Sequence, residues 1–147
     1  MQLRGFMWTL GNFASLVAAP TSIGSAAEPA MNPGVYEVEV RIGLPNVQDA
    51  TAPLVLTRCV RPADIASGRA FSILSENPLK ACDILDYAMA ADSVTYRIAC
   101  PGPNRGSAVA VFDLTATTYR GSITMNMGGK NMTMWETQVG KRIANCD

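Results

Sequence analysis

Residues 119–135 read Tyr119-Arg-Gly-Ser-Ile-Thr-Met-Asn-Met-Gly-Gly-Lys-Asn-Met-Thr-Met-Trp135, and this stretch has the clearest structural pattern in the chain. Its first half alternates apolar and polar side chains with a period of two, which is typical of a half-buried strand. The pair Gly128-Gly129 follows, and glycine readily adopts the positive φ angles of a tight turn. The stretch therefore predicts a β-hairpin with one apolar and one polar face.

The apolar face of this hairpin carries Met125, Met127, Met132 and Met134. A two-residue turn would pair Met125 with Met132, whereas a four-residue turn over 128–131 would pair Met127 with Met132 and Met125 with Met134. Either register places the thioethers on one face. Such side chains fill irregular cores or line apolar pockets, and thioether sulfur is also a soft ligand for Cu(I). We predict that the four residues line a ligand pocket, with a Cu(I) site as the alternative.

The second strand of the hairpin contains an irregularity. Met132 and Met134 share a face with Glu136 and Gln138, whereas Trp135 belongs to the other face. A β-bulge near Trp135 would correct the phase, and without a bulge Glu136 points inward. The sequence leaves both possibilities open.

The beginning of the chain resembles an export signal. Arg4 is the only charged residue before position 28, residues 6–19 are mostly apolar, and Ser25-Ala26-Ala27 offers the small residues of a signal-peptidase site. The apolar run is short for a membrane span, although an uncleaved anchor is the alternative. We predict a signal peptide over 1–27, a single domain over 28–147 without a transmembrane segment, and a periplasmic or secreted location.

The charge balance and the missing residue types exclude several classes of function. The sequence has 12 Lys and Arg, 12 Asp and Glu, and no His. This balance provides no field to attract nucleic acid, so no nucleic-acid partner is expected.

Without histidine, Ser–His and Cys–His catalysis and most zinc enzymes are ruled out. The chain also lacks a P-loop, G-x-G-x-x-G and G-x-S-x-G. We predict that the protein is not an enzyme and needs no cofactor, although the carboxylate pairs Glu37 with Glu39 and Asp83 with Asp86 remain conceivable acid–base groups.

The remaining chain consists of short strands joined by turns. The expected strands are residues 34–42, 54–60, 83–89, 94–100, 107–117, 119–127 and 132–139. Residues 61–74 are the one good helix candidate, in which Pro62 suits the first turn and Gly68 weakens the middle, so we expect a short or broken helix. Seven strands with tight turns predict a mainly β fold, either a curved antiparallel meander or an up-and-down β-barrel.

The four cysteines are Cys59, Cys82, Cys100 and Cys146, which fit two disulfides in an oxidising compartment. They contain no C-x-x-C pair, which argues against zinc. A turn at residues 91–92 brings Cys82 and Cys100 together at the open end of one hairpin. Following the strand directions onward, Cys146 finishes at the opposite end of the sheet, where Cys59 can reach it. We predict the pairs Cys82–Cys100 and Cys59–Cys146.

Several landmarks of the sequence match one known family. They are Asn32-Pro-Gly-Val-Tyr-Glu-Val38, Thr57-Arg-Cys-Val-Arg-Pro-Ala-Asp64, Val94-Thr-Tyr-Arg-Ile-Ala-Cys100, residues 119–127 and Gly140-Lys-Arg-Ile-Ala-Asn-Cys146. Together they resemble the domain-of-unknown-function family 3617, small exported proteins of Gram-negative bacteria, although Tyr36 stands where the family often has Trp. The resemblance implies a periplasmic, disulfide-bonded β domain and brings no established activity.

These observations predict a non-catalytic periplasmic binding or accessory module. In this interpretation the concave face of the sheet holds an apolar ligand or a partner protein. The alternative is a periplasmic protein that binds Cu(I) through the methionine-lined hairpin.

Overall fold

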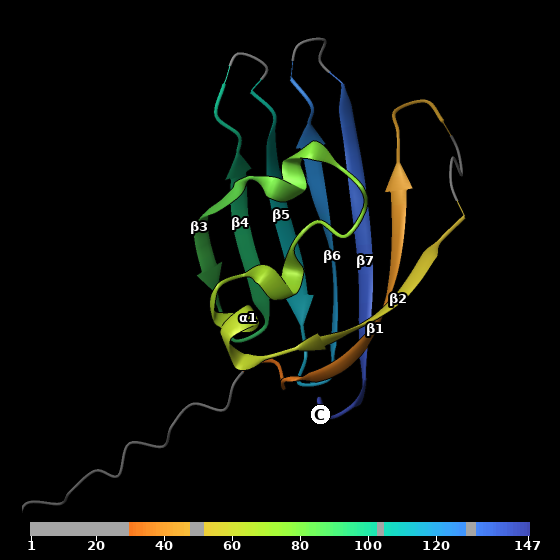
Figure 1. The fold of residues 1–147 in the computed structure, drawn as a ribbon, viewed down its shortest axis with the longest axis vertical. Helices are drawn as coiled ribbons and strands as arrows, with labels where there is room; N and C mark the ends of the chain where they lie inside the picture. Colours follow the sequence, from red (N-terminus) through yellow and green to blue (C-terminus); the bar gives the residue numbers. More distant parts are fainter. Residues whose placement is uncertain (1–29, 48–51, 103–104, 129–131) are drawn as a thin grey trace, which may run out of the picture.

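A computed structural model of the chain contains one seven-stranded antiparallel sheet (Figure 1). The structure describes residues 30–47, 52–102, 105–128 and 132–147, so the predicted signal peptide over 1–27 lies outside the described residues. The strands are β1 Gly34–Gly43, β2 Leu54–Val60, β3 Asp83–Met89, β4 Ser93–Ala99, β5 Ser107–Leu114, β6 Thr118–Asn126 and β7 Thr133–Ala144. The predicted mainly β fold is confirmed.

The strand order in the sheet is β2-β1-β7-β6-β5-β4-β3. Five consecutive strands, β3 to β7, form a meander, and β1 then pairs with β7 rather than with β3. Strands β2 and β3 are therefore the two edges. Of the two predicted architectures, the structure has the open antiparallel sheet.

One face of the sheet, called here the inner face, is covered by the connection between β2 and β3. This connection, residues 61–82, is called the crossover, and in Figure 1 it runs along the face of the sheet in front of the central strands. It contains the short helix α1 Pro62–Ala66 and the 3₁₀ turns η1 Arg69–Phe71 and η2 Pro78–Ala81. Gly68 has a φ of 79°, a left-handed conformation that ends α1. The predicted broken helix is confirmed, and no helix in the described part of the chain is long and apolar enough to cross a membrane.

Aromatic side chains fasten the crossover to the sheet. Phe71 is fully buried, and its ring centroid lies 5.4 Å from that of Phe112 and 5.5 Å from that of Tyr119. Tyr119 lies directly over Gly140 on β7, where a Cβ atom would be only 2.1 Å from the tyrosine ring. Close approach of the ring to the backbone therefore requires glycine at position 140.

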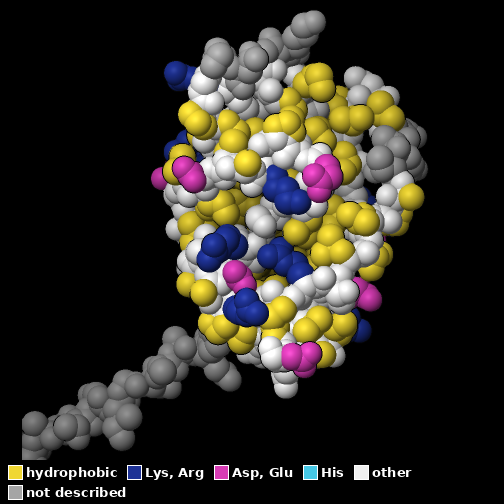
Figure 2. Space-filling model, in the orientation of Figure 1, with side chains coloured by type: hydrophobic (Ala, Val, Ile, Leu, Met, Phe, Trp, Pro, Cys, Tyr) yellow, Lys and Arg dark blue, Asp and Glu magenta, His cyan; other side chains and the backbone are white. Residues whose placement is uncertain are grey.

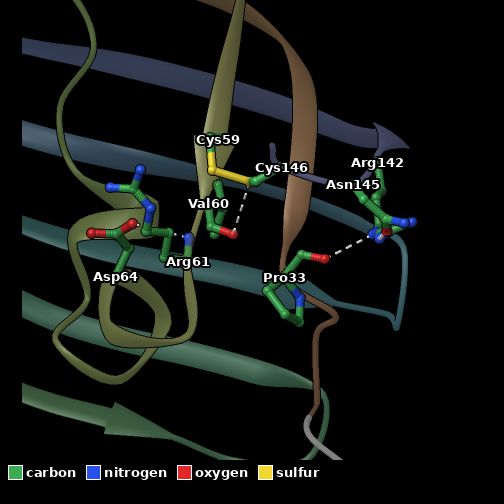
Figure 3. Close-up of a disulfide and its surroundings, with 8 residues drawn as sticks. All are labelled: Pro33, Cys59, Val60, Arg61, Asp64, Arg142, Asn145 and Cys146. Carbon is green, nitrogen blue, oxygen red and sulfur yellow. Dashed lines mark hydrogen bonds between the residues drawn. A yellow bond between two sulfur atoms is a disulfide. The ribbon is translucent and has the colours of Figure 1, made fainter.

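The two predicted disulfides are confirmed. Cys82 pairs with Cys100 and Cys59 pairs with Cys146, with Cα–Cα distances of 5.2 and 5.5 Å. Figure 3 shows the second bond at the end of β2, beside the residues that begin α1. Cys59 lies just before the crossover and Cys82 ends it, so each end of the crossover is covalently tied to another part of the domain.

Candidate functional site

The methionine hairpin has the register that a four-residue turn produces. Met125 lies opposite Met134 and Asn126 lies opposite Thr133, while the N–H of Met127 donates to the carbonyl of Met132 at 2.9 Å. Gly128 has a φ of 72°, as the turn requires. Residues 129–131 of the predicted turn lie outside the described residues.

Three of the four methionines meet at one side chain of the crossover. The Asn77 Nδ2 atom lies 3.4 Å from Sδ of Met125, 3.6 Å from Sδ of Met127 and 3.5 Å from Sδ of Met134. We call these three methionines the thioether cluster. Met125 is fully buried, whereas Met132 is 59% exposed and lies outside the cluster. The hairpin thus brings together three of the four predicted residues.

The orientation of Asn77 is fixed by its other amide atom. Its Oδ1 accepts a hydrogen bond of 2.8 Å from the N–H of Leu79, as an N-cap residue of η2 does. Its NH₂ group consequently faces the thioether cluster, whose sulfurs are weak acceptors. In the sequence Asn77 stands only as the residue before Pro78, three residues beyond the helix candidate over 61–74. Nothing in its local pattern indicates the three sulfurs.

A second polar arrangement is centred on Glu136, which is 0% exposed. Its carboxylate accepts hydrogen bonds from the N–H of Leu74 at 2.9 Å, the N–H of Ser75 at 3.0 Å, and the Ser75 hydroxyl. Gln138 Nε2 donates to the same carboxylate at 2.6 Å and to the carbonyl of Ser72 at 2.8 Å. Two crossover N–H groups thus find their acceptor on β7.

This network decides the phase of β7, which the sequence left open. The pairing of β6 with β7 runs without a shift through Thr124↔Trp135 and Ile123↔Glu136. Trp135 therefore faces outward and is 38% exposed, and Glu136 faces inward. An inward carboxylate is retained because an irregular segment buried against a sheet must find partners for its backbone groups.

Other inward polar side chains serve the crossover in the same way. The hydroxyl of Tyr96 donates to the carbonyl of Phe71 at 2.6 Å, and the hydroxyl of Tyr87 donates to the carbonyl of Ile65 at 2.5 Å. Burial, reinforced by the nearby Glu136 carboxylate, raises the pKa of Tyr96 above its ordinary value. We call Glu136, Gln138, Tyr87 and Tyr96 the polar centre of the inner face, and their hydrogen bonds hold the crossover against the sheet.

A large open groove lies between the crossover and the β3–β4 edge of the sheet. Its volume is about 1120 Å³, and its lining includes the apolar residues Ile73, Ile84, Leu85 and Ile98. Four cationic residues, Arg58, Arg61, Arg69 and Lys80, also line it, against the two acidic residues Asp64 and Asp83. We call this feature the basic groove. Figure 2 shows Lys and Arg side chains gathered on this side of the molecule.

The cations of the basic groove are only partly paired. Arg69 Nε lies 3.8 Å from the Asp64 carboxylate, and Asp64 also accepts the N–H of Arg61 at 3.0 Å. Figure 3 shows Arg61 and Asp64 beside the Cys59–Cys146 disulfide. Arg58 Nη2 donates to the carbonyl of Arg69 at 3.0 Å, while its buried Nη1 has no hydrogen-bond partner within the described residues. Lys80 Nζ lies 3.5 Å from the exposed Glu76 carboxylate, so the four cations exceed the three nearby carboxylates by one positive charge.

Each carboxylate pair considered from the sequence includes one residue that is bonded to an arginine. Glu37 lies on the outer face, as does Glu39, which pairs with Arg41 at 2.7 Å. Asp86 has a φ of 52° and accepts a hydrogen bond of 2.6 Å from Arg97. Within the described ranges, no group of three or more His, Cys, Asp or Glu residues could hold a metal ion.

A comparison with protein-family models matches residues 31–146 to the family described as a protein of unknown function, DUF3617. The chain belongs to this family. The resemblance noted from the sequence is thereby confirmed, and the match spans the sheet, the crossover and all four cysteines. Neither a curated protein nor a solved structure matches the chain.

Proposed function

We propose that the protein is a non-catalytic binding module of the periplasm, where it binds a molecule that combines an anionic group with an apolar part. The basic groove carries this proposal. Its four cations outnumber its two acidic residues, and isoleucine and leucine side chains lie beside them. A carboxylate or phosphate would pair with the arginines. An alkyl chain would cover Ile84 and Leu85, which are partly exposed, since Ile73 and Ile98 are already buried.

The crossover moves the proposed binding surface away from the middle of the concave sheet. Phe71, Ile73 and Leu79 of the crossover are each at most 3% exposed and fill the space over the inner face. An apolar ligand would have to displace this packing to reach the centre of the sheet. The groove at the margin of the crossover requires no such rearrangement.

The compartment and the lack of catalysis are part of the same proposal. Two disulfides tie the domain together, and such bonds persist in oxidising compartments. The sequence begins with a stretch typical of export signals and contains no histidine. N-terminal sequencing of the protein from its own cells should begin within a few residues of Glu28, and a retained Met1 would contradict export.

The experiment compares two matched amphiphiles on the purified, disulfide-bonded protein. We expect dodecanoate to bind saturably in calorimetric titrations, and dodecyltrimethylammonium, with the same alkyl chain and the opposite charge, to bind far more weakly. Arg69→Gln combined with Lys80→Gln should weaken dodecanoate binding by about tenfold, because each exposed charge contributes up to about 1 kcal/mol.

The control removes the same charge from the outer face, as Arg41→Gln combined with Arg120→Gln. Equal losses in both double variants would contradict a specific groove. Native mass spectrometry of protein purified from its own periplasm provides the second test. A bound anionic lipid supports the proposal, whereas a stoichiometric partner protein would favour the accessory role instead.

A further inference from the structure

The thioether cluster is arranged like a set of ligands around one point. All three sulfurs lie between 3.4 and 3.6 Å from the Asn77 Nδ2 atom, and they come from β6, from the residue after β6 and from β7. The pairing of Met125 with Met134 across two adjacent strands holds two of them directly side by side. The positions of Met125 and Met134 are therefore set by the sheet, and Met127 lies one residue beyond the end of β6.

The chemistry of this point favours a soft cation. Thioether sulfur is neutral and polarizable, and it suits Cu(I) and related soft monovalent ions. The group now facing the sulfurs is an amide NH₂, whose hydrogens carry only partial positive charge and for which sulfur is a weak acceptor. The three lone-pair donors thus surround a weak electropositive group that a full cation could replace.

The rest of the chain offers few other soft donors. The sequence has no histidine, and all four cysteines are engaged in disulfides. In an oxidised protein of this composition, methionine is the side chain left for a soft metal. The three-sulfur arrangement is also distinct from the basic groove, since none of its members lines that groove.

We propose that Met125, Met127 and Met134 form a binding site for one soft monovalent cation of the Cu(I) class. The amide group of Asn77 occupies the site in the absence of the ion and is displaced when the ion binds. Asn77 Oδ1 caps η2 through Leu79, so its displacement couples the ion to the last turn of the crossover. Met132, which is 59% exposed, is not a member of the site.

The experiment uses the full-length, disulfide-intact protein and Ag(I), a redox-inert ion of the same class, followed by Cu(I) under anaerobic conditions. Native mass spectrometry should show one ion per chain. With ¹³C-labelled methionine methyl groups, the NMR resonances of the three cluster residues should shift, and that of Met132 should not. Because neither thioethers nor amides titrate, the affinity should be constant from about pH 5 to pH 8, unlike that of a carboxylate or imidazole site.

Met134→Leu and Met132→Leu are the decisive matched variants, because each replaces one hairpin methionine with a residue of similar volume. Met134→Leu removes a ligand of the ion. We therefore expect the affinity of the protein for Ag(I) to fall by more than the roughly tenfold that is lost when a residue supporting a metal ligand is replaced. Met132→Leu should bind like the parent protein. If Met134→Leu does not fold, Met127→Leu, which is also half-buried, replaces it.

Asn77→Ser provides a test that a merely structural role of the cluster would not pass. Serine is a good N-cap for η2 but is too short to reach the sulfurs, so Ag(I) should bind several times more tightly. Unchanged or weaker binding in Asn77→Ser would overturn the displacement. No retained Ag(I), or equal losses in Met132→Leu and Met134→Leu, would overturn the site.

Discussion

The crossover meets β6 and β7 at two polar places that are built differently. At Glu136, four donors converge on a carboxylate that is completely buried. At Asn77, one amide faces three sulfurs at 3.4 to 3.6 Å. The first place pairs strong donors with the strongest acceptor available to a protein, and the second pairs an amide with weak acceptors.

This difference suggests different roles: the Glu136 network holds the crossover on the sheet, and the thioether cluster is available to bind an ion. Opening the Glu136 network would leave backbone N–H groups and a carboxylate unpaired inside the protein, which is costly. Moving the Asn77 amide away from the sulfurs loses the weak N–H···S contacts and disturbs one N-cap hydrogen bond. We therefore expect substitutions at Glu136 to lower the free energy of unfolding strongly and substitutions at Asn77 to lower it only slightly.

Placing a charge in the thioether cluster should have the largest effect. Met125→Asp buries an unpaired carboxylate where Met125 is 0% exposed, so we expect a loss of at least about 4 kcal/mol in the free energy of unfolding. Thr124→Asp and Thr133→Asp add the same charge at exposed positions of the same hairpin and should be mild. Denaturant unfolding measures all three, and similar losses would contradict the inward orientation of Met125.

Removing the buried carboxylate should have the next largest effect. Glu136→Leu leaves the N–H groups of Leu74 and Ser75 without their acceptor, so we expect a loss of roughly 3 kcal/mol. Glu39→Leu is the matched control on the outer face, where a change within about 0.5 kcal/mol is expected. A Glu136→Leu protein as stable as its parent would show that the network does not fasten the crossover.

Alkaline pH should loosen the polar centre and leave the thioether cluster unaffected, since the cluster has no titratable group. Burial raises the pKa of Tyr96 and of Tyr119. Below the ordinary tyrosine pKa of about 10, both residues are protonated in the folded and the unfolded state, so this contribution is complete. Above it, the unfolded chain releases protons that the folded chain retains, and stability falls.

Each of these tyrosines should steepen the loss by up to about 1.4 kcal/mol per pH unit. Urea unfolding between about pH 8 and pH 11.5 measures the slope, and phenolate absorbance shows when the tyrosines ionise. Tyr96→Phe, which cannot ionise, should have a shallower slope. The same slope in both proteins would mean that Tyr96 ionises as readily in the folded state as in the unfolded state.

Removing the amide from the thioether cluster should have the smallest effect. Asn77→Ala deletes the N-cap of η2 along with the contacts to sulfur, so we expect a loss of about 1 kcal/mol, typical of a lost cap. Thermal unfolding of Asn77→Ala, Glu136→Leu and the parent protein under the same conditions compares the two losses of stability directly. A loss as large as that of Glu136→Leu would mean that the amide fastens the crossover as strongly as the carboxylate does.

The parts of the fold that depend on short-range pattern could be predicted from the sequence. Strands such as β5 alternate strictly, and Ala108, Ala110 and Phe112 are buried where the alternation places them. The disulfides followed from strand directions, because each hairpin fixes which ends meet. The choice between an open sheet and a barrel remained open, since nothing local shows whether β2 and β3 pair.

The candidate sites depend on contacts that no local pattern records. Glu136 is bonded to Leu74 and Ser75, which are 62 and 61 residues earlier in the chain. In the sequence Glu136 occupies an apolar position of β7, and only the N–H donors of the crossover explain a carboxylate there. Asn77 likewise reaches Met134 across 57 residues. An irregular connection gives no period from which its path over the sheet could be inferred.

The spacing of the two disulfides has a consequence for how the protein is made. The sequence separation is 18 residues for Cys82–Cys100 and 87 residues for Cys59–Cys146. Because a polypeptide is synthesised from its N-terminus, the first three cysteines exist before Cys146 does. During that interval Cys59 can form a disulfide only with Cys82 or Cys100, neither of which is its native partner.

A premature bond from Cys59 to Cys82 would close the crossover into a loop and leave Cys100 and Cys146 to each other. Reaching the native pairs from there requires attack of a thiolate on an existing disulfide. The yield of native protein is therefore expected to depend on a disulfide isomerase as well as on an oxidant. Cells that supply the oxidant alone should accumulate the mispaired form.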